Sequence, residues 1–552
     1  MSAKRLPAKN KPTSVIAFFA IIALIPISEL VRQVVIGEYL QAIVIFSWFL
    51  AIFLLPVFIF QKNIKIYLLI LIPIYLLIPL NLLYILSFNS AVSSDLTLLF
   101  LNTNRYEVME LLKHYYMPLI LIWAIYLAIL IFLYSRCPKV IASKLAFSIS
   151  GISLVVVLLF PFLDMKHSSM TYYNTARTSF NNIFPTSMIK GVNRYVQENS
   201  LIESSKPYRD AFKFDAKQDS SVHNKQQIVI LIIGESSRYD HWGVNGYSRN
   251  TSPRLSKRTN LISFNNVATG AYVTERSVPL ILTGVGAVNF DEHVKRKGIF
   301  GVFDEARFNT YFITDQPGDT GNIGVHALES QHQYRMMQDK HHDKDMNLLD
   351  TLNKIIKQPG DKKFIIIHTM GSHYDYADRY SPDYEVFKPS NTTVKSRVND
   401  LTKRNVLVNT YDNTIAYSDA VIDSVISVAN KLNVISAVTY ISDHGEDLLD
   451  NSKHYNYHIN GLPPSTYVAH IPLFIWYSTK LQQQYPDKIS NLRLHKNAKI
   501  SSENVIYTLS SLLGINYSKL DPSKDVTSGN YKDNQQVLMG EGATIYPFSV
   551  CK

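Results

Sequence analysis

The chain has 552 residues, a formal net charge of +11 and two cysteines, Cys137 and Cys551. Its length exceeds that of one compact domain, and no nucleic-acid recognition motif accompanies its Lys and Arg residues, which argues against a nucleic-acid-binding protein. Because Cys137 borders an apolar run and Cys551 is next to the last residue of the sequence, no disulfide is expected within a soluble domain.

Five apolar runs fill the first 163 residues, and each is close to the roughly 20 residues that a helix needs to cross a bilayer. Buried helices of a soluble core are the alternative, but five such runs in one stretch favour a membrane domain. The first run lacks a small-residue cleavage site and four more follow, so it is not a cleaved signal. The predicted spans are Thr13–Val34, Leu40–Phe60, Ile66–Leu86, Met117–Tyr134 and Leu145–Leu163.

Basic residues in the short loops predict the orientation of these spans, because Lys and Arg concentrate on the cytoplasmic side. Nine lie before the first span or in alternate loops, and three lie in the opposite loops. The N-terminus is therefore predicted to be cytoplasmic, and an odd number of spans places the chain after Leu163 outside. The nine are Lys4, Arg5, Lys9, Lys11, Lys62, Lys65, Arg136, Lys139 and Lys144, and the three are Arg32, Arg105 and Lys113.

The chain after the spans divides into two parts. Residues 164–225 mix aromatic and polar residues, which indicates an interfacial linker of short amphipathic pieces at the membrane surface; an ordinary exposed linker is the alternative. Residues 226–552 alternate β-rich runs with helical segments, which predicts an α/β domain with a largely parallel central sheet flanked by helices. The predicted strands are Ile228–Ile233, Tyr311–Thr314, Phe364–Ile367, Ala437–Ile441 and Leu473–Trp476.

Polar residues follow three of these predicted strands. Glu235 follows the first, His373 comes shortly after the third, and Asp443 and His444 follow the fourth. Ligands of such sheets bind beyond the carboxyl ends of the strands. We therefore expect these side chains to meet at one edge.

Carboxylates and imidazoles are ligands that zinc prefers, and a catalytic zinc keeps one position for the reacting group. Glu235, Asp443 and His444 suit that set, although a lone carboxylate after a strand is more often a helix cap. Thr274 precedes an apolar helical run and is the candidate nucleophile, because a metal lowers the pKa of a hydroxyl. The alternative for Thr274 is an ordinary N-cap.

The motifs resemble those of the membrane phosphoethanolamine transferases of Gram-negative bacteria, members of the alkaline phosphatase and sulfatase superfamily. This resemblance implies zinc bound by Glu235, Thr274, Asp443 and His444, with phosphoethanolamine carried transiently on Thr274. It spans nearly the whole chain, behind five predicted spans. The matching segments are "GESSRYDHWGVNGYSRNTSPRL", "TERSVP", "IIIHTMGSHYDYADRYSPDYEVFKP", "NTYDNTIAYSD" and "SDHGEDL".

The resemblance also implies a second set of histidines that binds the transferred phosphate or another zinc. His373 matches one member, and either His454 or His458 matches the other. Thr103 and Glu107 match residues that line the donor-lipid site, although Leu99 stands where the family has an asparagine. Family members that act on lipid A carry disulfides in the soluble domain, and this chain lacks the cysteines for them.

The implied reaction moves phosphoethanolamine from phosphatidylethanolamine to a periplasmic acceptor. The expected acceptor is lipopolysaccharide, at its lipid A or its core, and a periplasmic glucan or a protein are the alternatives. The enzyme is expected to be a monomer in the bacterial inner membrane with its catalytic domain in the periplasm. Alternatives are a glycerol-phosphate transferase of the lipoteichoic acid synthase type and a non-catalytic membrane scaffold. A sulfatase is disfavoured, because "VTERSVP" lacks the Cys or Ser-x-Pro-x-Arg sequence that matures into formylglycine.

Overall fold

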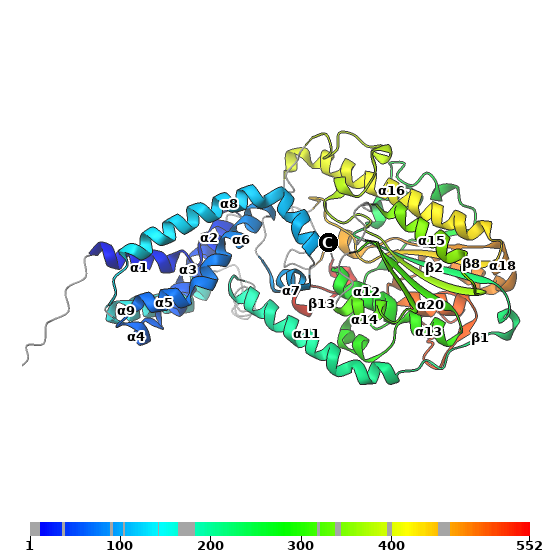
Figure 1. The fold of residues 1–552 in the computed structure, drawn as a ribbon, viewed down its shortest axis with the longest axis horizontal. Coiled ribbons are helices and arrows are strands. Elements are labelled where there is room, and N and C mark those ends of the chain that lie inside the picture. The colour runs from blue at the N-terminus through cyan, green and yellow to red at the C-terminus, as the bar shows by residue number, and fades with distance from the viewer. Residues whose placement is uncertain are drawn as a thin grey trace, which may run out of the picture. The chain divides into compact units, whose positions relative to one another are not determined.

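A computed structural model shows two compact units, residues 1–101 with 105–194 and residues 102–104 with 195–552 (Figure 1). Each unit has its own buried core. The structure describes residues 12–35, 39–88, 92–102, 105–141, 143–163, 183–316, 321–336, 344–394, 400–450 and 464–551.

The first unit is helical. Its described elements are α1 (Pro12–Ala23), α2 (Ile27–Val35), α3 (Tyr39–Leu54), α4 (Val57–Phe60), α5 (Ile64–Ile70), α6 (Ile72–Phe88), α7 (Ser94–Asn102), α8 (Arg105–Arg136) and α9 (Ser143–Leu163). Many of their large apolar side chains are exposed in this unit, as expected of surfaces that face lipid.

One described helix, Tyr115–Arg136, is long and apolar enough to cross a membrane, and the number rises to three if each of two bent helix pairs is one span. The α1–α2 pair is bent by 66° and the α5–α6 pair by 49°. Pro26 and Pro73 lie at these bends, and proline removes a helical N–H and clashes with the preceding turn. The remaining apolar helices are shorter, so five spans stay a prediction.

The second unit contains a seven-stranded sheet in the order β3-β9-β8-β2-β7-β5-β6. β9 is antiparallel to both neighbours and the other pairs are parallel, so the sheet is mixed but largely parallel. All five predicted strands are present; the run at Leu473–Trp476 is the antiparallel one. The bounds are β2 (Gln227–Gly234), β3 (Leu261–Phe264), β5 (Asn309–Thr314), β6 (His332–Arg335), β7 (Lys362–His368), β8 (Ile435–Ser442) and β9 (Leu473–Tyr477).

Helices cover both faces of this sheet (Figure 1). Val229, Leu231 and Ile233 of β2 pack in one core with α12, α13 and α20, and the alternate residues of β2 pack in the other core with α15 and α16. Side chains of a strand point alternately to opposite faces, which explains why β2 is fully buried and apolar from Ile228 to Ile233. These helices are α12 (Thr274–Thr283), α13 (Ile299–Glu305), α15 (Leu348–Ile356), α16 (Arg404–Lys431) and α20 (Asn504–Leu512).

Smaller elements complete this unit. Three two-stranded pairs join β1 to β11, β4 to β10 and β12 to β13. Their bounds are β1 (Lys217–Gln218), β4 (Val267–Ala268), β10 (Ile500–Ser501), β11 (Ile515–Asn516), β12 (Val537–Met539) and β13 (Ile545–Pro547). The other helices are α14 (Gly321–Ala327), α17 (Thr466–Ala469), α18 (Thr479–Gln484) and α19 (Pro486–Leu494).

The predicted linker contains one long helix where short pieces were expected. α11 (Thr186–Ala211) is continuous over 26 residues, and residues 164–182 lie outside the described part. Ile189, Val192 and Val196 are exposed on α11. Their spacing places them along one side of the helix, as an amphipathic segment requires.

Candidate active site

The candidate residues come from neighbouring strands of the sheet. β8, β2 and β7 are adjacent and parallel, so their carboxyl ends share one edge. Gly234 pairs with Ser442 at the end of the β2–β8 ladder. Glu235 and Asp443 therefore leave the sheet level with each other, because each is the next residue of its strand.

Glu235, Asp443 and His444 form a compact buried cluster. His444 Nε2 lies 3.5 Å from Glu235 Oε1 and 3.3 Å from Asp443 Oδ2. All three residues are buried, and one potential ligand atom from each lies within 4.8 Å of the other two. The sequence order Asp-His after one strand and Glu after its neighbour is what brings these atoms together.

Thr274 is the first residue of α12, and its hydroxyl points into this cluster. Thr274 Oγ1 donates to Glu235 Oε2 at 3.1 Å and lies 3.4 Å from His444 Nε2. Val273, not Thr274, is the N-cap of α12, and its carbonyl accepts the N–H of Ser277. The hydroxyl is thus directed at the acidic cluster and does not cap its helix.

The hydrogen bonds around the cluster leave lone pairs facing inward. His444 Nδ1 lies 2.8 Å from the carbonyl of Gly445, which can only accept, so Nδ1 carries a hydrogen and the neutral ring presents the Nε2 lone pair to the cluster. Asp443 Oδ1 accepts the backbone N–H groups of Ser236 and His444 at 3.0 and 2.7 Å. Asp443 Oδ2 is buried and has no hydrogen-bond partner among the described residues.

The electrostatics of the cluster also suit a cation. Burial, and secondly the negative charge of Asp443, raise the pKa of the Glu235 carboxyl well above its usual value. A divalent cation would offset both effects. Two carboxylates, one imidazole nitrogen and one hydroxyl are a donor set that fits such an ion, so the residues present fit a metal.

Further groups that sequence reasoning did not single out hold Glu235. Ser236 Oγ donates to Glu235 Oε1 at 2.8 Å, and Gln316 Nε2 donates to Glu235 Oε2 at 3.1 Å. Gln316 also donates to the carbonyl of Thr369 at 2.8 Å. The position of Gln316 in the sequence could have identified it as a site residue, because it follows β5, another strand that ends at the same edge of the sheet.

His373 lies in a loop that packs directly on Glu235. Ser372 N–H donates to the carbonyl of Glu235 at 2.9 Å. A Cβ on Gly371 would come within 2.9 Å of the Glu235 backbone, and Gly371 has a φ of +47°, so only glycine fits without strain. The ring of His373 is half-buried, and its Nδ1 donates to the carbonyl of Tyr374 at 2.7 Å.

The remaining predicted residues are not brought into the site by the described structure. His454 and His458 lie outside the described residues, as does Thr103. Glu107 belongs to α8, but the structure does not describe its side chain. Cys137 and Cys551 are free, buried thiols in different units.

The fold and the site together define the class of protein. Residues 227–515 match the family model described as Sulfatase. The chain therefore belongs to the sulfatase family, whose model covers Glu235, Thr274, Asp443 and His444. The resemblance to membrane phosphoethanolamine transferases is confirmed by the relatives within that family.

Phosphoethanolamine transferase EptC of Escherichia coli K12 is 27% identical over 503 residues, which are 88% of this chain and 86% of EptC. The crystal structure of the periplasmic domain of Escherichia coli EptC in complex with Zn has a TM-score of 0.55 and 26% identity, and covers 61% of this chain and 96% of that domain.

The membrane protein lipooligosaccharide phosphoethanolamine transferase A (EptA) of Neisseria meningitidis has the same fold over nearly the whole length. Its structure matches with a TM-score of 0.73 at 22% identity, and covers 93% of this chain and 97% of EptA. A helical unit joined to a sulfatase-like domain is therefore the architecture of this chain.

Proposed function

We propose that this protein is a zinc-dependent transferase that moves phosphoethanolamine from phosphatidylethanolamine to an acceptor in the bacterial envelope. The proposed acceptor is lipopolysaccharide, modified on its lipid A or its core. The hydroxyl of Thr274, directed at the buried Glu235, Asp443 and His444 cluster, is the observation that carries the proposal. The names of the relatives support the transferred group, and the lipooligosaccharide enzyme supports the acceptor class.

The transfer takes two steps. Thr274 Oγ1 loses its proton and attacks the phosphorus, the bond from phosphorus to the glycerol oxygen breaks, and that oxygen takes up a proton as diacylglycerol leaves, so the net proton transfer is from Thr274 to diacylglycerol. The acceptor oxygen then attacks the same phosphorus, the bond to Thr274 breaks, and the Thr274 hydroxyl is restored. Zinc, when bound, would lower the pKa of the attacking hydroxyl and stabilise charge on the phosphoryl oxygens.

Other residues have supporting roles in this proposal. His373, and either His454 or His458, would contact the transferred phosphate or a second zinc, and Thr103 and Glu107 would contact the donor lipid. The protein would act as a monomer in the inner membrane, with five spans, a cytoplasmic N-terminus and a periplasmic catalytic domain. The proposal also keeps the predicted division of the chain into a membrane domain, a linker and a catalytic domain, with boundaries after residues 163 and 225.

We expect zinc binding to weaken as the pH falls. The pKa of Glu235 is raised in the metal-free protein, so zinc must displace a proton from this carboxyl. A raised carboxyl pKa also means that the metal-free fold loses stability as the pH rises from the ordinary carboxyl range through the raised value. Titration calorimetry of the full-length protein with zinc, in two buffers of different ionisation enthalpy, should show that zinc binding releases protons. Zinc binding without proton release would contradict the prediction.

The acceptor is tested in cells. Mass spectrometry of envelope glycolipids should show phosphoethanolamine on lipid A or core sugars when the parent chain is expressed, and none when the Thr274→Ala chain is expressed. Glycerol phosphate on the product would instead support a transferase of the lipoteichoic acid synthase type. Identical glycolipids in both strains would overturn the proposed acceptor.

A further inference from the structure

Ser236 lies between the two carboxylates of the site and contacts both. Its hydroxyl donates to Glu235 Oε1 at 2.8 Å, and its backbone N–H donates to Asp443 Oδ1 at 3.0 Å. Its φ is 53°, in the left-handed region that residues with a side chain rarely adopt. Such a conformation persists only where its surroundings fix it.

The Tyr411 hydroxyl holds the backbone on both sides of this turn. It donates to the carbonyl of Ser236 at 2.7 Å and accepts the N–H of Arg238 at 2.9 Å. The N–H of Ser237 is held separately, by Ser442 Oγ at 2.9 Å. Buried backbone groups need such partners, so one phenol oxygen sets the path of the chain that carries Ser236.

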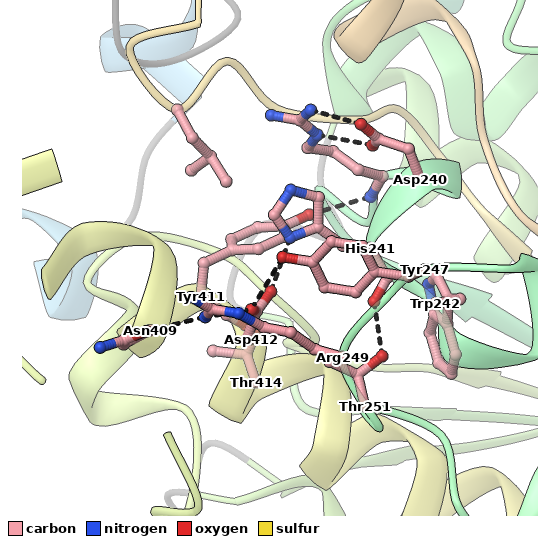
Figure 2. Close-up of polar contacts among 12 residues, drawn as sticks. Asp240, His241, Trp242, Tyr247, Arg249, Thr251, Asn409, Tyr411, Asp412 and Thr414 are labelled. Atoms are coloured by element: carbon pink, nitrogen blue, oxygen red, sulfur yellow. Dashed lines mark hydrogen bonds and ion pairs between the residues drawn. The ribbon is translucent and has the colours of Figure 1, made fainter. Parts of the chain in front are cut away.

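A buried polar network fixes Tyr411 in turn (Figure 2). Asp412, the next residue of α16, accepts from His241 Nδ1 at 2.6 Å, from the Tyr247 hydroxyl at 3.1 Å and from Arg249 at 2.8 Å. Arg249 also donates to Asn409 Oδ1 at 2.7 Å. The ring of His241 packs edge-on against that of Tyr411, with 5.2 Å between centroids. This network joins α16 to the segment that follows Glu235.

We propose that Tyr411 is a positioning residue for the metal ligands, acting through Ser236 on Glu235 and Asp443 together. The proposal rests on the zinc-dependent function proposed above. Partners outside the first layer of ligands orient them, and their loss commonly weakens metal affinity or activity about 10–100-fold. The Tyr411 hydroxyl is bonded to the backbone of Ser236 and Arg238, so its effect on the ligands is transmitted through that backbone.

The test compares Tyr411→Phe with Tyr417→Phe in the full-length protein. Tyr417 is a matched control, because it is a buried tyrosine of the same helix whose hydroxyl accepts the N–H of Met346 at 3.1 Å, away from Ser236. Zinc affinity, measured by chelator competition, should fall about 10–100-fold in Tyr411→Phe. It should stay at the parent value in Tyr417→Phe. The absorption spectrum of the cobalt-substituted protein should shift in Tyr411→Phe alone.

Parent zinc affinity and an unshifted cobalt spectrum in folded Tyr411→Phe would overturn this inference and leave the proposed function standing. A parent chain that binds no zinc would overturn the proposed function itself. Should Tyr411→Phe not fold, Ser236→Ala takes its place, because it removes the hydroxyl bond to Glu235 and keeps the N–H bond to Asp443. A zinc affinity about 10-fold weaker is then expected, and an unchanged affinity would contradict the role of Ser236.

Discussion

Thr274→Ala should reduce phosphoethanolamine transfer by at least about 1000-fold, because it removes the oxygen that forms the bond to phosphorus. The fold should persist, since Thr274 caps no helix and, among the described residues, its hydroxyl bonds are with Glu235 and His444 of the cluster. Transfer is measured with purified protein and a fluorescent donor lipid, and folding by thermal unfolding.

Thr283→Ala is the matched control for this substitution. Thr283 lies at the other end of α12, and its hydroxyl donates to the carbonyl of Pro279 at 2.7 Å. It should lose some stability but keep parent transfer. Comparable transfer by Thr274→Ala and Thr283→Ala would assign the nucleophile elsewhere.

Asp443→Asn should lower zinc content and transfer together, by more than about 100-fold in transfer. The substitution keeps the size of the side chain but removes the charge and the unpartnered oxygen that faces His444 and Glu235. Zinc is quantified by elemental analysis of the purified protein, before and after incubation with a chelator.

Asp525→Asn is the control for the loss of a buried carboxylate. Asp525 is buried in the same unit and accepts from the N–H and hydroxyl of Thr527, far along the chain from the site. Its replacement should lower stability without loss of zinc. Full zinc occupancy in Asp443→Asn would remove Asp443 from the set of proposed ligands.

Much of the catalytic unit could be predicted from the sequence, because its central strands are buried on both faces and read as unbroken apolar runs. Ile228–Ile233 of β2 and Phe364–Ile367 of β7 are runs of this kind. β6, with the sequence HQYR, is a largely exposed edge strand and carries no such signal. The direction of β9 could not be read either, since an apolar run is the same for a parallel and an antiparallel strand.

The proposed ligands could be found because they directly follow strands. Gln316 could have been found by the same rule, because it follows β5. Tyr411 could not, because it lies within a helix and meets Ser236 across a long stretch of chain. In the membrane unit, apolar composition indicated spans but not where prolines bend them. Pro26 and Pro73 divide runs that look continuous by hydropathy alone.

The proposed reaction requires Thr274 to carry phosphoethanolamine between the donor and the acceptor. The most direct measurement is the intact mass of the zinc-loaded protein, and the mass of its Thr274 peptide, after incubation with phosphatidylethanolamine vesicles in the absence of an acceptor. The parent chain should gain the mass of one phosphoethanolamine on Thr274, and Thr274→Ala should gain none. An adduct on another residue, or transfer without any adduct in rapidly quenched samples, would contradict the account.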